Sequence, residues 1–377
     1  MTAVQLPLDF GDSGGVGLPP QLDPMRTRPA NDAFDSADYV FETRWNGVRT
    51  LAAIERGRVR LRNYRLGDVT ARFPELALLR HAAAEQPLLL DGEIVIVDQR
   101  GRPDFDSLER RLRLLDDRLI ADEASKRPAC FLATDVLFRG SQWLLREPLL
   151  RRKRILAEVL HRGDCLYLSE AFEGEGHALF QAALDSELDG VIAKPANGPY
   201  TPGDFGGGWL TVSHGRRELV VGGYSMQIAG SSRMIELLVG SFDDGGSLIF
   251  ETAAQLPADE PRRTELFTVM NALQVDEPPF AEAPPFIACW VRPELVVTVD
   301  YRRPAGEDEV RCPIVERVRL DVAPDECRLP VDAPPPTPSL AAPRPRLTLL
   351  TTLPLPFEPA SPALPASRPF LRVVGAD

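Results

Sequence analysis

The chain has 377 residues, 44% of them hydrophobic and 26% charged, which is the balance of a soluble globular protein with room for two domains. Its net charge of −12 argues against a broad nucleic-acid-binding surface, because an acidic body opposes the counterion release that drives phosphate binding. The cysteines and histidines are dispersed and no apolar run could span a bilayer, so we expect a cytoplasmic protein with neither a zinc site nor membrane contact.

Residues 1–20 are rich in glycine and proline and predict a disordered tail. Within this tail, Gln5, Leu6, Leu8 and Phe10 fit the Gln-Leu-x-Leu-x-Phe peptide that bacterial proteins use to dock on a sliding clamp. The apolar side chains would fill a groove, and the Gly-rich segment that follows suits a tethered peptide. The alternative is a chance match in a low-complexity segment.

Residues 21–214 mix strand and helix patterns. Runs that alternate or are rich in β-branched residues predict strands at residues 58–62, 87–97, 129–138 and 190–194. Helical spacing of apolar residues predicts helices at residues 106–115, 149–160 and 177–188. The chain should therefore begin with an α+β domain.

Residues 215–328 change to strand after strand. Short apolar runs predict strands at residues 218–226, 234–242, 247–254, 294–302 and 315–322. One helix is expected near residues 261–273, and five strands with a helix between the third and the fourth are typical of an OB-fold β-barrel. Residues 329–377 are loaded with proline and predict a second disordered tail.

The segment FETRWNGVRT, from Phe41 to Thr50, resembles the nucleotide-binding motif of ATP-dependent DNA ligases, in which a lysine precedes an x-Asp-Gly-x-x-Arg pattern. Later segments resemble further motifs of that family in the same order, at residues 90–95, 188–212 and 310–321. The resemblance spans roughly residues 20–328. It implies a nucleotidyltransferase domain followed by an OB-fold domain. The nucleotide pocket would lie between these two domains, which would close around nicked DNA.

The family's reactive residues are replaced in this chain. A lysine amine of such ligases attacks the α-phosphate of ATP, but here Arg44 stands at that position, and its guanidinium stays protonated. Asn46 replaces an acid, Thr134 replaces the aromatic residue that stacks on adenine, and Thr211 and Ser213 replace two lysines. These losses together predict a pseudo-ligase.

Other positions keep the family's pattern: Glu42, Arg49, Glu93 and Lys194 match it, and Asp189 replaces a glutamate. The resemblance therefore implies a nucleotide-binding set of Glu42, Asn46, Arg49, Glu93, Thr134, Lys194 and Thr211. It also implies that Glu93 and Asp189 would be the metal ligands. ATP and magnesium would be cofactors if activity remains; otherwise the matching residues are structural remnants.

Three hypotheses follow. The first is a catalytically inactive scaffold or regulator of DNA repair that contacts DNA or repair proteins. The second is a working ATP- and magnesium-dependent DNA ligase with a non-standard nucleophile, for which Lys194 is the first candidate. The third is an adaptor bound to a sliding clamp through residues 5–10.

Overall fold

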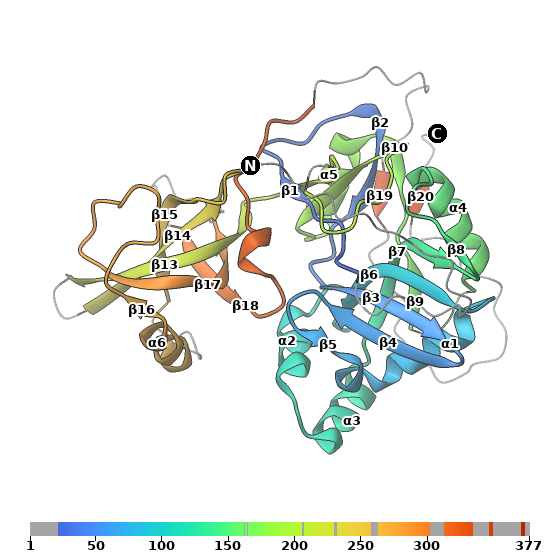
Figure 1. Ribbon diagram of the computed structural model, residues 1–377, viewed down its shortest axis with the longest axis horizontal. Helices are drawn as coiled ribbons and strands as arrows, with labels where there is room; N and C mark the ends of the chain where they lie inside the picture. The colour runs from blue at the N-terminus through green and yellow to red at the C-terminus, as the bar shows by residue number, and fades with distance from the viewer. Residues whose placement is uncertain are drawn as a thin grey trace.

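The computed structural model describes residues 22–161, 163, 165–205, 207–229, 232–257, 263–301, 313–334, 347–349 and 371–373. Figure 1 shows two bodies side by side: a larger domain of helices and two sheets, and a smaller β-barrel. The candidate docking peptide, residues 5–10, lies outside the described ranges. Within those ranges no helix combines the length and the apolar content that a membrane crossing requires.

The first domain contains two sheets. The five-stranded sheet has the order β1 (Arg28–Pro29), β12 (Leu210–Ser213), β11 (Gly190–Pro195), β2 (Ser36–Thr43) and β10 (Phe172–Gly174). The second sheet has the order β5 (Gly67–Asp68), β4 (Arg58–Asn63), β3 (Val48–Glu55), β6 (Leu88–Val95), β7 (Cys130–Arg139) and β8 (Gln142–Trp143), with β9 (Leu166–Leu168) parallel to β7. β6 lies between β3 and β7, and nearly all of its residues are buried, including the charged Asp91.

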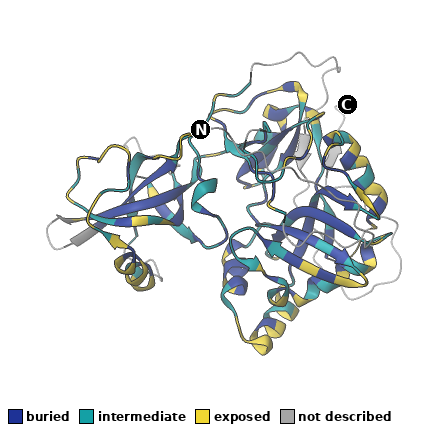
Figure 2. Ribbon diagram, in the orientation of Figure 1, coloured by how far each residue is buried: buried dark blue, intermediate teal, exposed yellow. Residues whose placement is uncertain are grey.

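Helices cover the outer faces of these sheets. They are α1 (Leu79–Ala82), α2 (Phe105–Arg113), α3 (Asp117–Lys126), α4 (Leu149–Val159) and α5 (Gly176–Asp185), with 3₁₀ turns η1 (Thr70–Arg72) and η2 (Pro74–Leu78). The Asp104 carboxylate caps α2 by accepting the Ser107 amide at 3.0 Å, which satisfies a backbone donor that a helix leaves unpaired. α3 buries only Ile120, and Figure 2 accordingly shows most of its surface exposed.

The second domain is a closed barrel. Its elements are β13 (Arg216–Ala229), β14 (Ser232–Phe242), β15 (Leu248–Leu256), α6 (Arg263–Ala272), β16 (Gln274–Val275), β17 (Cys289–Asp300), β18 (Ile314–Arg319) and η3 (Pro324–Glu326). β13 pairs with both β14 and β17, which closes the ring β13-β14-β15-β18-β17. The predicted α+β fold is confirmed. In the barrel, α6 follows β15 as expected, and the short strand β16, which the sequence did not predict, lies between α6 and β17.

Residues 329–334, at the start of the predicted disordered tail 329–377, pair with the rest of the chain. Pro324–Pro334, named here the C-terminal strap, returns to the first domain, where the Val331 amide donates to the Pro29 carbonyl at 2.9 Å. The Asn31 amide donates back to the Val331 carbonyl at 3.0 Å. A proline-rich segment cannot build a core, but it can still pair its remaining amides with the edge of an existing sheet. Farther along, β19 (Leu347–Leu349) pairs with β20 (Leu371–Val373).

Candidate nucleotide pocket between the two domains

A cavity of about 510 Å³ lies between the first domain, the barrel and the C-terminal strap. Its volume falls in the range of small-molecule sites. Seven predicted site residues line it: Arg44, Asn46, Arg49, Glu93, Thr134, Lys194 and Thr211. Glu42 lies behind Lys194, to which it is bonded, and Asp189 lines a smaller neighbouring cavity of about 270 Å³.

Arg44, just after β2, reaches from the first domain to the barrel. Its guanidinium donates to Glu218 Oε1 on β13 at 2.8 Å and also to the Ser213 hydroxyl. The same Glu218 oxygen accepts a hydrogen bond from Arg319 of β18 at 3.0 Å. Burial would raise the pKa of Glu218, but Arg44 and Arg319 lower it to about 2, so this carboxylate is ionised at neutral pH. An ion-pair network thus joins the two domains at the predicted nucleophile position.

A tight turn places Asn46 and Gly47 beside β6. Asn46 adopts φ 54°, and its side-chain oxygen accepts a hydrogen bond from Arg319 at 3.1 Å. The Gly47 amide donates to Glu93 Oε2 at 3.0 Å, and a Cβ at Gly47 would lie 2.6 Å from a β6 carbonyl oxygen. Burial raises the pKa of Glu93 despite the neighbouring cations. Position 47 requires glycine because the backbone here lies too close to β6 to leave room for a Cβ atom.

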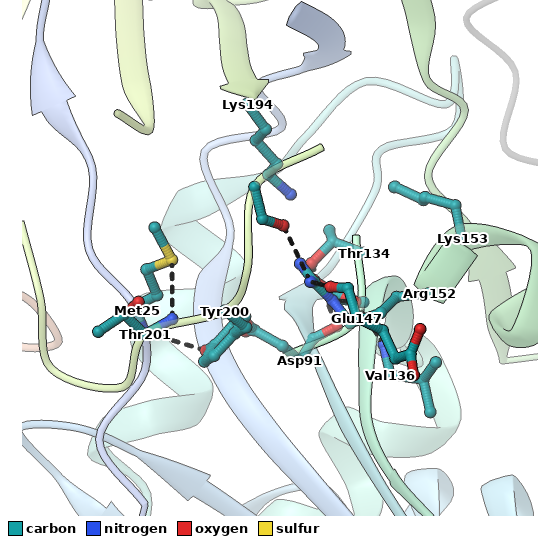
Figure 3. A network of polar contacts seen from close by, with 12 residues as sticks. Met25, Asp91, Thr134, Val136, Glu147, Arg152, Lys153, Lys194, Tyr200 and Thr201 are labelled. Atoms are coloured by element: carbon teal, nitrogen blue, oxygen red, sulfur yellow. Dashed lines mark hydrogen bonds and ion pairs between the residues drawn. The ribbon is translucent and has the colours of Figure 1, made fainter. Parts of the chain in front are cut away.

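Arg49 is held by a buried carboxylate below the pocket. Its guanidinium makes two hydrogen bonds to Asp91, at 2.6 and 3.2 Å, and the Tyr200 hydroxyl donates to the same carboxylate at 2.8 Å. Figure 3 shows Asp91 and Tyr200 in contact, with Met25 bonded to Tyr200 from the other side. The Thr134 hydroxyl donates to the Asp91 backbone carbonyl at 3.2 Å. These bonds fix the floor of the pocket.

Two lysines share one buried carboxylate at the opposite wall. Lys194 on β11 and Lys153 on α4 each place their Nζ 2.9 Å from Glu42 Oε1, and all three side chains are mostly buried. Figure 3 shows the two lysines extending from these separate elements. The Lys194 ammonium also lies 4.3 Å from the centre of the Trp209 ring, a cation–π contact. Burial lowers the pKa of Lys153, although Glu42 opposes this effect.

The two predicted metal ligands are engaged by other donors. Asp189 pairs with Arg216 of β13, and Glu93 accepts the Gly47 amide. Within the described ranges, no group of three or more His, Cys, Asp or Glu side chains is placed to hold a metal ion. This closed arrangement therefore does not provide a donor set that fits Mg²⁺.

Comparison with known proteins identifies the family. The model described as the ATP dependent DNA ligase domain matches residues 24–212, and the model of the ATP dependent DNA ligase C terminal region matches residues 230–322. The chain belongs to the ATP-dependent DNA ligase family. The resemblance drawn from the sequence motifs is thus confirmed.

Several ligase-family relatives align over much of the chain. The multifunctional non-homologous end joining protein LigD of Mycolicibacterium smegmatis is 28% identical over 298 residues, covering 78% of this chain and 37% of that protein. DNA ligase C2 of the same organism is 30% identical over 263 residues, covering 69% of this chain and 72% of that protein. A solved structure of mycobacterial DNA ligase D complexed with ATP and MES has a TM-score of 0.52 at 28% identity, covering 81% of this chain and 97% of that one. The chain spans little more than a third of the LigD protein.

Sequence reasoning placed this ligase-family pocket between the two domains but did not name the residues that β13 contributes to it. Arg216, Arg217 and Glu218 all line the cavity, and Arg217 pairs with Glu251 inside the barrel. The sequence feature that could have indicated them is the Arg-Arg-Glu triplet, which lies at the domain boundary directly before an apolar run. The strap was missed too, although its Asp325 pairs with Arg26 at 2.6 Å.

Proposed function

We propose that this chain is a DNA-repair protein of the ligase family that forms no covalent adenylate and acts as a scaffold or regulator. The observation that carries the proposal is the state of Arg44. Its guanidinium is ion-paired with Glu218, and the motif resemblance aligns Arg44 with the lysine that attacks ATP in ligases. Burial alone would lower the pKa of Arg44, but Glu218 and Asp189 raise it above its ordinary value. A guanidinium in this state has no lone pair with which to attack phosphorus.

The remaining pocket cations support the same conclusion. In the described part of the chain, each one is paired with an internal carboxylate: Arg49 with Asp91, Lys194 with Glu42, Arg216 with Asp189, Arg217 with Glu251, and Arg319 with Asp321. A triphosphate would have to displace carboxylates from these partners, and each displacement would leave a buried charge uncompensated. The predicted adenine position offers Thr134, which has no aromatic ring to stack on a base.

A working ligase with another nucleophile is the second candidate, because Lys194 lines the cavity. Its amine is held between Glu42 Oε1 at 2.9 Å and the centre of the Trp209 ring at 4.3 Å. This geometry supports a structural Lys194 more than a reactive one. Phosphoramide formation there would need an amine that gives up its proton.

The deciding experiment is the intact mass of the purified chain after incubation with ATP and magnesium. We expect no added AMP on the wild-type protein. We also expect none on Arg44→Lys, because the other phosphate-binding positions stay substituted or internally paired. An AMP adduct on the wild-type chain would overturn the proposal, and peptide mapping would then show whether Lys194 carries it.

The repair association rests on the names of the relatives, among them the end-joining protein LigD. DNA, other repair proteins and a sliding clamp are the proposed partners. Contacts to the phosphates of the DNA backbone release counterions, so retention of the protein on DNA should weaken steeply as the salt concentration rises. Retention that does not depend on salt would argue against phosphate contacts. Clamp binding is tested with the intact chain against a form lacking residues 1–12. If the intact chain is not retained by the clamp, the adaptor hypothesis is wrong.

A further inference from the structure

The carboxylate of Glu218 lies between guanidinium groups from both domains. Its Oε1 atom accepts from Arg44 at 2.8 Å and from Arg319 at 3.0 Å. Around this centre, Arg44 also donates to the Ser213 hydroxyl, and Arg319 donates to the Asn46 side-chain oxygen at 3.1 Å. All five residues line the cavity of about 510 Å³, so a ligand in the cavity can reach the centre.

Planar guanidinium groups that converge on one anionic oxygen form the arrangement with which arginines bind phosphate. In this structure the anionic oxygen between the two guanidinium groups is Glu218 Oε1. Burial raises the pKa of its carboxyl group, yet Arg44 and Arg319 lower that pKa to about 2. Arg44 and Arg319 therefore stabilise the ionised form of Glu218 strongly. A neutral group in the same place would not receive this stabilisation.

The two arginines differ in how far they depend on Glu218. Arg319 also makes two hydrogen bonds to Asp321, at 2.9 and 2.8 Å, and therefore keeps a carboxylate when Glu218 is absent. Arg44 makes no ion pair other than the one to Glu218 within the described residues. Removal of the Glu218 charge would leave Arg44 as an unpaired, largely buried cation.

We infer that Glu218 is an internal ligand of a phosphate-binding centre formed between the domains by Arg44 and Arg319, and that external phosphate groups compete with it. The inference rests on the proposed function, since it takes Arg44 as a non-covalent anion binder. Arg44 and Glu218 belong to different domains, so a phosphate that replaces Glu218 also releases the pair that joins them. Phosphate binding and domain opening are thereby coupled.

The test is calorimetric titration with inorganic pyrophosphate in the absence of magnesium. Glu218→Gln should bind pyrophosphate at least about tenfold more tightly than the wild-type chain. In this variant the Arg44 guanidinium has lost its ion pair with Glu218 and can donate its hydrogen bonds to phosphate. The matched control is Glu294→Gln, which removes an exposed barrel carboxylate and should leave the affinity unchanged. The double variant Glu218→Gln with Arg44→Gln should lose the gain. Equal affinity in Glu218→Gln and wild type, or a gain that survives in the double variant, overturns the inference.

A second variant covers the case in which Glu218→Gln fails to fold. Glu218→Asp keeps the charge but shortens the side chain, so it loosens both contacts and should give a smaller gain in pyrophosphate affinity. An unchanged affinity in Glu218→Asp would then overturn the inference. Because pyrophosphate affinity is read separately from the AMP adduct, a failure here is distinguishable from a failure of the proposed function.

Phosphate monoesters reach such a centre from a nucleotide or from a DNA end. The two sources are separated by titrating a variant that shows the gain with AMP, with a nicked duplex carrying a 5′-phosphate, and with the same duplex carrying a 5′-hydroxyl. Tighter binding of AMP identifies a nucleotide, whereas preference for the 5′-phosphate over the 5′-hydroxyl identifies the DNA end. No gain with either phosphate would overturn the inference.

Discussion

The charge on Glu218 should stabilise the closed protein measurably, and replacing it with glutamine (E218Q) removes that charge with little change in shape. The side chain is only 20% exposed, and although burial opposes ionisation, Arg44 and Arg319 lower the pKa from 4.5 to about 2. At about 1.4 kcal/mol for each tenfold change in proton affinity, this corresponds to about 3 kcal/mol. Breaking a buried ion pair by removing one partner gives a similar figure, about 3–5 kcal/mol.

The pH dependence follows from the direction of the shift. Because the pKa of Glu218 is lower in the folded protein, its stabilisation is complete well above 4.5 and is lost as the pH falls toward about 2. About 1 kcal/mol of it should be gone by pH 4. The assay is urea unfolding of wild type and E218Q in buffers from pH 7 to pH 3, with Glu294→Gln as the exposed control. A difference below about 1 kcal/mol at pH 7, or one independent of pH, would refute the reasoning.

Three further substitutions test the packing around the pocket. Arg152→Ala leaves the fully buried Asp135 unpaired and should lower the free energy of unfolding by about 3–5 kcal/mol, measured by urea titration; a loss under 1 kcal/mol would contradict it. Gly47→Ala forces a Cβ to 2.6 Å from a β6 carbonyl oxygen and should destabilise by about 1–3 kcal/mol; an unchanged thermal midpoint would show that the turn can relax. Lys153→Met should change stability by less than about 1 kcal/mol, since burial lowers the pKa of Lys153 and Glu42 keeps its other lysine; a large loss would assign Lys153 a structural role.

The order of the motifs along the chain predicted which residues would line the pocket. Positions as distant as Arg44 and Thr211 line one cavity, and the local hydrophobic patterns predicted the barrel strands and their helix. The loss of the nucleophile at position 44 could also be predicted from sequence alone, because a guanidinium stays protonated in folded proteins and has no lone pair to attack with. The candidate docking peptide at residues 5–10 remains a prediction, since it lies outside the described part of the chain.

Only the tertiary structure revealed which partners Arg44 and the strap contact. Arg44 and Glu218 are 174 positions apart in the chain, and no local pattern connects them. The strap is a second example. A proline-rich sequence indicates that a segment cannot form a core, but it does not indicate whether the segment will form backbone hydrogen bonds with the edge of a nearby sheet. Residue type thus determined which chemistry position 44 had lost. Long-range ion pairing, which depends on how the two domains meet, decided that this position now joins them.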